Sequence, residues 1–132
     1  MSSPNYKINN NVSAHSISID ANQTQNDDDC VHVNLRYFQP KQECFSDWQI
    51  KELKQFSQWV KKMSDRAVAD VQGDTQLCHA HVGKMKALPD EISRDAQIYS
   101  LKVTGKARVH GFFFGNNFFL IWLDRNHKIL KV

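Results

Sequence analysis

The last third of the chain constrains the fold most, because it consists of short apolar segments separated by turn signals. Residues 97–103, 107–114 and 118–123 have the composition of strands, and a glycine stands in each gap between them. Residues 115–117, Gly-Asn-Asn, are typical of a hairpin, since glycine and asparagine tolerate positive φ angles. Residues 118–123 are apolar on both faces, which indicates a central strand covered on both sides.

The middle of the chain predicts one earlier strand and a helix. Residues 30–38 alternate in polarity and predict a strand that ends before Pro40, because proline cannot donate to a sheet ladder. Ser46 and Gln49 have the spacing of a capping box at the start of a helix. The apolar stripe of this helix recurs at three- and four-residue steps through Ile50, Leu53, Phe56, Val60 and Met63.

The remaining segments complete the predicted fold class. A second short helix is expected over 65–71, with Gly73 as its stop signal. Residues 74–96 show no clear periodicity, and a turn at 124–127 leads to a last strand over 128–132. We therefore expect an α+β protein, in which an antiparallel sheet of four to five strands carries two N-terminal helices on one face.

The charge distribution divides the chain into an acidic tail and a basic body. Residues 1–29 are rich in Asn, Ser, Gln and Asp, and one lysine and four aspartates give them a net charge of −3. Such a segment buries too little to fold, so we expect a disordered tail followed by a single domain over 30–132. That domain has a net charge of +6, and residues 97–132 alone carry +5. An anionic partner and a merely solvated basic surface both explain this charge.

Length and composition exclude several classes of protein. The 132 residues contain no apolar run near the roughly 20 residues that span a bilayer, so no membrane partner is expected. The first residues lack the basic start and apolar core of a secretory signal. Three cysteines are too few for a disulfide scaffold, so a cytoplasmic protein is expected. Glycine-rich phosphate loops and the HExxH and GxSxG motifs are absent.

Arg108 and His110 form the first candidate site. Side chains alternate along a strand, so these two share one face while Ala107 and Val109 point to the helix-covered core. Arginine binds phosphate bidentately, and histidine transfers protons near neutral pH. The alternative is an exposed strand face on which the histidine is merely hydrogen bonded. Gly111 is either a bulge that re-aims the pair or a site of close packing.

The predicted turn at 124–127 begins a second group of polar residues. Asp124 and Asn126 suit the turn itself, whereas turn geometry does not explain Arg125, His127 and Lys128. His127 is either a second acid–base group or a surface residue. Arg125 and Lys128 are candidates for contact with an anionic substrate.

Neither a metal nor a cofactor is expected. Residues 78–81, Cys-His-Ala-His, hold three metal-ligand side chains, but no complete ligand set is visible around them. The aromatic residues are mostly core residues. Phe112 and Phe114 fall on the same strand face as Arg108, so one of them is a candidate for stacking on a nucleic-acid base.

The C-terminal run resembles the sheet of RelE/ParE-type toxins from bacterial toxin–antitoxin systems. In that family a strand ending in a basic residue precedes a strand of the type yRv, a hairpin, an apolar central strand and a final strand. Residues 101–103 (LKV), 107–109 (ARV) and 118–123 resemble the first, second and central strands. The likeness extends over about residues 45–132, and it implies a RelE-like fold. The leading strand over 30–38 departs from the family pattern.

The resemblance also implies a function and a set of roles. Ribonuclease members of this family cleave mRNA without a metal, by attack of a 2′-hydroxyl on the adjacent phosphate. Carried over, Arg108 stabilises phosphate charge, Lys102 and Lys106 hold the RNA backbone, and His110 and His127 act as base and acid. The implied partners are RNA or the ribosome, together with an antitoxin protein.

Two hypotheses of different class follow. The first is a toxin that acts as a metal-independent endoribonuclease on mRNA. The second is a non-catalytic inhibitory binding protein that blocks a macromolecular partner through its basic sheet, as members of the ParE branch block DNA gyrase. The first requires Arg108 and His110 to face an open surface together with Lys102 or His127.

Overall fold

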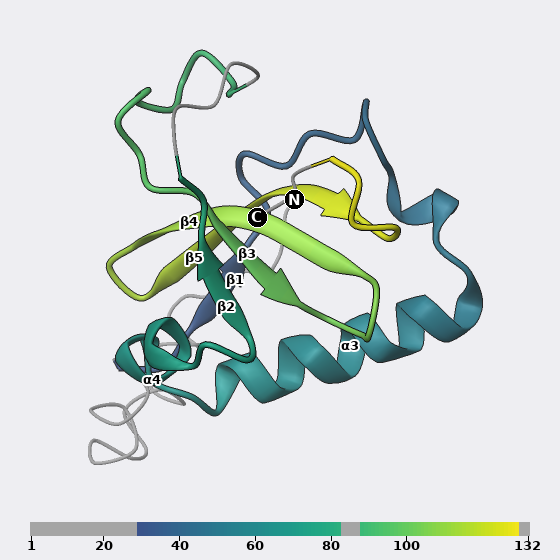
Figure 1. Cartoon of the computed structure of the whole chain (residues 1–132), viewed down its shortest axis with the longest axis horizontal. Coiled ribbons are helices and arrows are strands. Elements are labelled where there is room, and N and C mark those ends of the chain that lie inside the picture. The colour runs from purple at the N-terminus through teal and green to yellow at the C-terminus, as the bar shows by residue number, and fades with distance from the viewer. Residues whose placement is uncertain (1–28, 83–87, 130–132) are drawn as a thin grey trace, which may run out of the picture.

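The computed structural model describes residues 29–82 and 88–129, which form one five-stranded sheet with helices on one face (Figure 1). The sheet order is β1-β5-β4-β3-β2. Along the chain the elements are β1 (His32–Asn34), the 3-10 turn η1 (Phe45–Asp47), α3 (Ile50–Ser64), α4 (Val68–Gly73), β2 (Cys78–Ala80), β3 (Tyr99–Lys102), β4 (Arg108–Phe114) and β5 (Asn117–Asp124). The α+β class with two helices is as predicted.

The sheet is mixed, so the prediction of a purely antiparallel sheet is wrong. Strands β2, β3, β4 and β5 pair antiparallel in succession, but β1 pairs parallel to β5, with His32 opposite Asn117. A parallel pair needs a long crossover connection. Here both helices and three strands lie between β1 and β5 along the chain, which provides that connection.

The ends of the sheet also differ from the prediction. The strand predicted over 30–38 has only three residues, and Leu35 is exposed beyond its end. Lys128 and Ile129 are not in a strand, and the rest of the strand predicted over 128–132 lies outside the described residues. The fifth strand is instead β2, inside the stretch 74–96. A three-residue edge strand is too short to show alternation, which explains why the pattern missed it.

Helix α3 has the predicted apolar stripe but a different start. The predicted capping box of Ser46 and Gln49 is wrong, because Ser46 lies inside η1. The backbone N–H of Gln49 instead donates to Glu52 Oε1 at 2.7 Å, which caps α3 three residues later. The second helix is Val68–Gly73 rather than 65–71, with Gly73 as its last residue.

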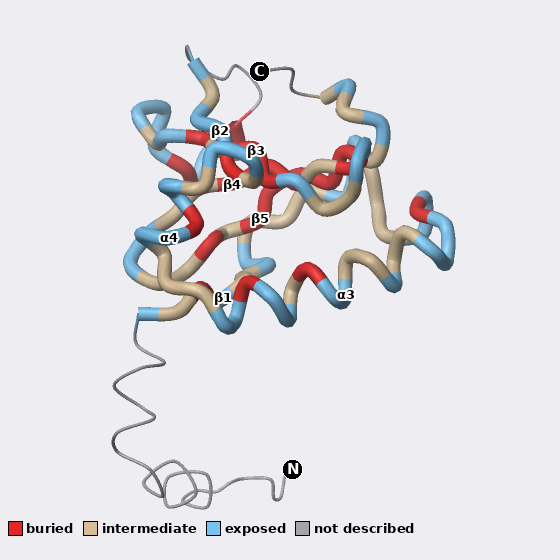
Figure 2. The backbone as a smooth tube through the Cα atoms, turned by 60° about the horizontal axis from the view of Figure 1, so that its bottom comes forward, coloured by how far each residue is buried: buried red, intermediate tan, exposed pale blue. Residues whose placement is uncertain are grey.

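Both faces of the sheet are covered over most of their area. Figure 2 shows the buried residues concentrated in the strands and on one side of α3. The first core lies between the sheet and α3, where Trp59 and Met63 belong to the same cluster as Val109 and Phe118. The second core lies on the opposite face and contains Leu88, Ile92, Ile98, Ile121 and Trp122.

A bulge between β4 and β5 shapes the second core. The register shifts between His110 and Gly111, so that His110 pairs with Trp122 and Gly111 with Leu120, and Ile121 has no partner residue. Ile121 and Trp122 therefore both contribute to the second core. A Cβ atom at Gly111 would collide with the carbonyl oxygen of Phe119. The unpaired residue of the bulge lies in β5, so Gly111 is a site of close approach opposite the bulge, and the interpretation of Gly111 itself as a bulge is wrong.

The segment before the sheet is only partly described. The predicted tail, 1–29, lies outside the described residues except for Asp29, whose carbonyl accepts a hydrogen bond from the Val68 backbone at 3.0 Å. No helix among the described residues is long and apolar enough to cross a membrane.

Candidate functional site

The predicted pair Arg108 and His110 lies on the face of β4 opposite α3. The register places Lys102 opposite Arg108 and Ser100 opposite His110, while Val109 between them packs in the first core with Trp59. The alternation expected from the sequence therefore holds along this strand.

The side chain of His110 is not at the surface, so the condition that the endoribonuclease hypothesis requires, an open surface shared by Arg108 and His110, is not met. The side chain of His110 is 0% exposed. The segment 88–98, together with Ile121 and Trp122 of β5, forms the second core on this face. Leu88, Ile92 and Ile98 are isolated apolar residues in a polar stretch, and all three are buried in this core.

His110 is the centre of a buried hydrogen-bonded network. Its Nδ1 lies 2.7 Å from Ser100 Oγ, and its Nε2 lies 2.8 Å from Asp124 Oδ2. Ser100 and Asp124 are only 1% and 2% exposed. An ionised carboxylate only accepts hydrogen bonds, so Nε2 carries the proton that faces Asp124. Both ring nitrogens are thus engaged inside the protein.

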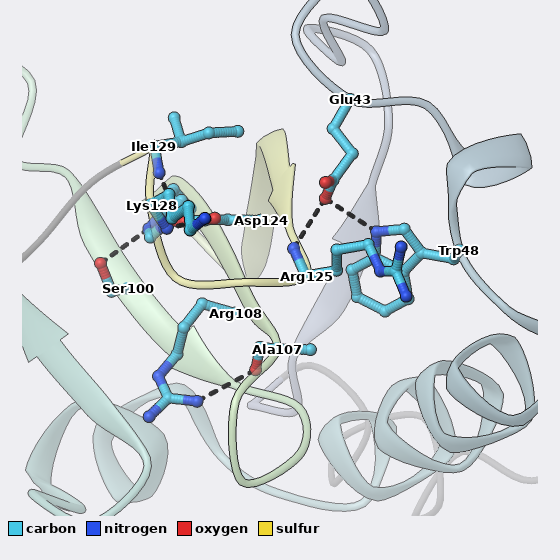
Figure 3. A network of polar contacts seen from close by, with 10 residues as sticks. Glu43, Trp48, Ser100, Ala107, Arg108, Asp124, Arg125, Lys128 and Ile129 are labelled. Atoms are coloured by element: carbon cyan, nitrogen blue, oxygen red, sulfur yellow. Dashed lines mark hydrogen bonds and ion pairs between the residues drawn. The ribbon is translucent and has the colours of Figure 1, made fainter.

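Asp124 extends this network to the segment after β5. Its Oδ1 accepts the Lys128 backbone N–H at 2.7 Å, and its Oδ2 accepts that of Ile129 at 3.0 Å. Figure 3 shows Ser100, Asp124, Lys128 and Ile129 close together at this point. Asp124 is therefore the turn former that the sequence indicated, and it also binds the histidine.

The order serine, histidine, aspartate is also that of a hydrolase triad, but the geometry does not support nucleophilic chemistry. The oxygen of a reactive serine must be accessible to the substrate, and hydrogen-bond donors must lie nearby to bind the oxyanion that forms. Ser100 is buried beneath the second core. The network therefore connects β3, β4 and the end of β5, and its role is structural.

Arg108 closes the turn between β3 and β4. Its Nη1 donates to the carbonyl oxygens of Thr104, Gly105 and Ala107 at 3.0, 3.3 and 3.1 Å. Figure 3 shows the guanidinium next to Ala107 and below the buried network. Carbonyl oxygens carry no formal charge, so these bonds position the guanidinium without neutralising it.

Arg125, predicted to bind substrate, forms an internal ion pair instead. Its Nε lies 3.1 Å from Glu52 Oε1, at the start of α3. Its backbone N–H donates to Glu43 Oε1 at 2.7 Å, and that oxygen also accepts the indole N–H of Trp48 at 2.8 Å (Figure 3). The Arg125 charge is thus used to join the end of β5 to the start of α3.

Four cations remain at this end of the sheet. Lys102 ends β3, Lys106 lies in the following turn, Arg108 begins β4, and Lys128 follows β5. The three lysines are exposed, and Arg108 is half-buried. None of the ion pairs found within residues 29–82 and 88–129 involves any of the four. We call this group, Lys102, Lys106, Arg108 and Lys128, the basic end.

His127 lies beside the basic end but has an unusual backbone. Its φ angle is +55°, and its backbone N–H donates to the Asp124 carbonyl at 3.3 Å. The residue is half-buried in the turn after β5. His127 and His110 contact different oxygens of Asp124, the backbone carbonyl and Oδ2.

The Cys-His-Ala-His stretch forms β2 and the residue after it. Cys78 is buried in the first core, and this burial raises the pKa of its thiol to about 11. A thiol with so high a pKa is a poor metal ligand and a poor nucleophile at neutral pH. Within the described ranges, no three side chains of the His, Cys, Asp and Glu types come close enough to hold a metal ion.

An aromatic groove lies at the other end of β4. Phe112 stacks on Phe119 with ring centres 5.1 Å apart, and Tyr37 lies 5.3 Å from Phe119. These rings line a hollow of about 570 Å³, which Phe114, 73% exposed, also borders. Phe112 packs against the second core, as the majority expectation for aromatic residues predicted.

Two features of the site have no counterpart in the sequence reasoning. Ser100 and Asp124 are partners of His110 only because of the strand register, which alternation alone does not define. Lys62 and Arg66, which the sequence did not single out, line a cleft together with Lys102. No family model, no curated protein and no solved structure matches this chain.

Proposed function

We propose that this chain is a non-catalytic module that binds RNA through its basic end. The observation that carries the proposal is the contrast between His110 and the four cations around it. The candidate base is sealed inside the protein with both ring nitrogens hydrogen bonded. The cations Lys102, Lys106, Arg108 and Lys128 are not involved in any ion pair among the described residues.

The geometry favours binding over cleavage. A general base must come within hydrogen-bond reach of the proton that it removes, directly or through one water. His110 has no exposed atom from which to do so. Of the predicted acid–base pair, His110 is buried and His127 is half-buried. Arg125, which was predicted to contact the substrate, is paired with Glu52. Endoribonuclease activity, which the likeness to RelE/ParE-type toxins suggested, is therefore the second candidate.

The arrangement of the cations suits a phosphate backbone. Lys102 and Arg108 are opposite each other in the sheet. The backbone N–H of Lys128 donates to Asp124, the last residue of the neighbouring strand β5. Arg108 is held rigid by three carbonyl oxygens, which lowers the entropy lost when it binds an anion. Each phosphate contact releases a counterion, so binding is expected to weaken steeply with salt.

The direct test is binding of a fluorescein-labelled single-stranded RNA of 12 nucleotides, followed by fluorescence anisotropy over a series of salt concentrations. Lys106→Glu and Lys128→Glu are each expected to weaken binding about tenfold and to reduce the salt slope. Lys61→Glu on α3 is the matched control, because it makes the same change of charge outside the basic end. Lys61 lies 3.8 Å from Asp65, with which it forms an ion pair.

The same samples, run on a denaturing gel, separate the two candidate functions. Intact RNA after long incubation supports binding alone. Cleavage by the wild type that Arg108→Gln abolishes, while Lys61→Glu retains it, would contradict the non-catalytic proposal. In induced bacterial cultures, an inhibitory binding module arrests growth and leaves no new RNA ends.

A further inference from the structure

A second cationic site lies between α3 and the end of β3. It is a cleft of about 400 Å³, within the range of small-ligand sites. Its polar lining comes from Gln55, Gln58 and Lys62 of α3, from Arg66 and Asp74 on either side of α4, and from Lys102. Two stretches that are distant in the sequence, 55–77 and 102–103, therefore converge on one hollow.

The charges of the cleft favour an anion. The lining includes three cationic residues, Lys62, Arg66 and Lys102, and one carboxylate, Asp74. Asp74 Oδ2 accepts from Arg66 Nη1 at 3.0 Å, and this hydrogen bond holds the pKa of the carboxyl below its usual value of 3.8. Lys62 and Lys102 take part in none of the ion pairs of the described residues. The cleft thus keeps an excess of two positive charges at neutral pH.

Arg66 is positioned from two sides. While Nη1 contacts Asp74, Nη2 donates to the carbonyl of Asp70 at 3.3 Å. A guanidinium fixed in this way presents a planar array of donors, the geometry that matches the oxygens of a phosphoryl group. The amides of Gln55 and Gln58 add uncharged donors and acceptors within the same cleft.

The wall of the cleft also contains an unsatisfied donor. Trp59 lines the cleft and is 4% exposed, and its indole Nε1 has no hydrogen-bond partner among the residues that the structure describes. A buried N–H without an acceptor is costly, so this group requires an explanation, and an acceptor on a bound ligand provides one. This observation is independent of the charge count.

We propose that the cleft between α3 and β3 binds a phosphoryl group that carries a hydrogen-bonding substituent. Lys62, Arg66 and Lys102 bind the phosphate oxygens, and Gln55 and Gln58 contact the substituent. The phosphoryl group comes either from a free nucleotide or from the backbone of a nucleic-acid strand. Lys102 belongs to both sites, whereas Lys62 and Arg66 belong to the cleft alone. Variants at Lys62 therefore test the cleft separately from RNA binding by the basic end.

The experiment uses the full chain with three probes: AMP, adenosine and inorganic phosphate, each titrated by calorimetry and by amide chemical-shift mapping. AMP is expected to bind at one site, to shift amides of α3 and β3, and to bind at least tenfold more tightly than adenosine. Lys62→Glu is expected to lower the AMP affinity at least tenfold. Lys61→Glu, the neighbouring exposed lysine outside the cleft, is expected to change it less than twofold.

The RNA oligonucleotide distinguishes the two sources. If AMP and inorganic phosphate do not bind, but Lys62→Glu weakens RNA binding at least tenfold more than Lys61→Glu, the phosphoryl group belongs to a nucleic-acid strand. Equal effects of Lys62→Glu and Lys61→Glu, or no binding of any phosphate-bearing probe, overturn the proposal. If AMP does not bind, RNA binding that is lost in Lys128→Glu and unchanged in Lys62→Glu also overturns it, while leaving the function of the basic end intact.

Discussion

His110 Nε2 and Asp124 Oδ2 lie 2.8 Å apart, with neither side chain more than 2% exposed. Asp124→Ala is expected to destabilise the protein by about 3 to 5 kcal/mol, because it leaves a buried imidazole and two backbone N–H groups without their acceptor. Urea unfolding followed by fluorescence measures this loss. Asn126→Ala, an exposed change in the same turn, is expected to stay within about 0.5 kcal/mol of the wild type. Equal stability of the two variants would disprove the structural role of the network.

The close approach at Gly111 predicts a second, sharper contrast between two glycines. Gly111→Ala places a methyl group against the Phe119 carbonyl and is expected to cost about 3 kcal/mol or more, through displacement of β5. Gly105→Ala has nothing within 4 Å of the new Cβ and is expected to change stability by less than about 1 kcal/mol. Thermal denaturation of both variants decides the point, and similar melting temperatures would contradict the register at the bulge.

Arg108 allows charge and shape to be separated. Arg108→Lys keeps the positive charge but loses the planar donors that reach three carbonyl oxygens. Stability is expected to fall by about 1 to 2 kcal/mol, while RNA affinity changes less than about threefold if the contact is electrostatic. Lys106→Arg, in the same turn, is expected to change neither quantity. A large loss of RNA affinity with unchanged stability would show that the guanidinium is needed for recognition.

Burial of Cys78 predicts a loss of stability in alkali. The pKa of this thiol is raised from 9.0 to about 11, so above pH 9 the unfolded chain loses the proton first. This contribution is complete below pH 9 and is lost as the pH rises through 11, by roughly 2 to 3 kcal/mol in total. Urea unfolding of Cys78→Ala between pH 8 and pH 11 is expected to lack this part of the pH dependence.

The thiol of Cys44 provides the matched control. Hydrogen bonds from Ser46 lower its pKa, so it is expected to react with iodoacetamide in the native protein at a pH where Cys78 does not. Mass spectrometry of the labelled chain identifies the site. Labelling of Cys78 before Cys44 would contradict the burial of β2 against the first core.

The segments that the sequence predicted well are those with local periodicity. The stripe of α3 and the strands β3, β4 and β5 repeat over enough residues to define a face, and their bounds lie within two residues of expectation at most ends. β2 has three residues, and the parallel pairing of β1 depends on a partner far along the chain. Neither carries a local signal.

The same distinction applies to the candidate site. Alternation placed Arg108 and His110 on one face, but it carried no information about what covers that face. The second core on that face includes Leu88, Ile92 and Ile98, which are too few to define a regular period over 88–98. The ion pair of Arg125 with Glu52 joins two elements that no local pattern connects. Long-range contacts therefore determined which of the predicted residues remained accessible.

The parallel strand β1 has a consequence for the order of folding. Asn34 donates from its side chain to Asn117 at 3.3 Å, across 83 residues of chain. During synthesis, β1 leaves the ribosome long before β5, the strand that it pairs with, exists. The backbone N–H and C=O groups of β1 that pair with β5 therefore remain hydrogen bonded to water until β5 has been synthesised. Contacts between residues so far apart in the sequence slow folding, so completion of the sheet is expected to be a late event.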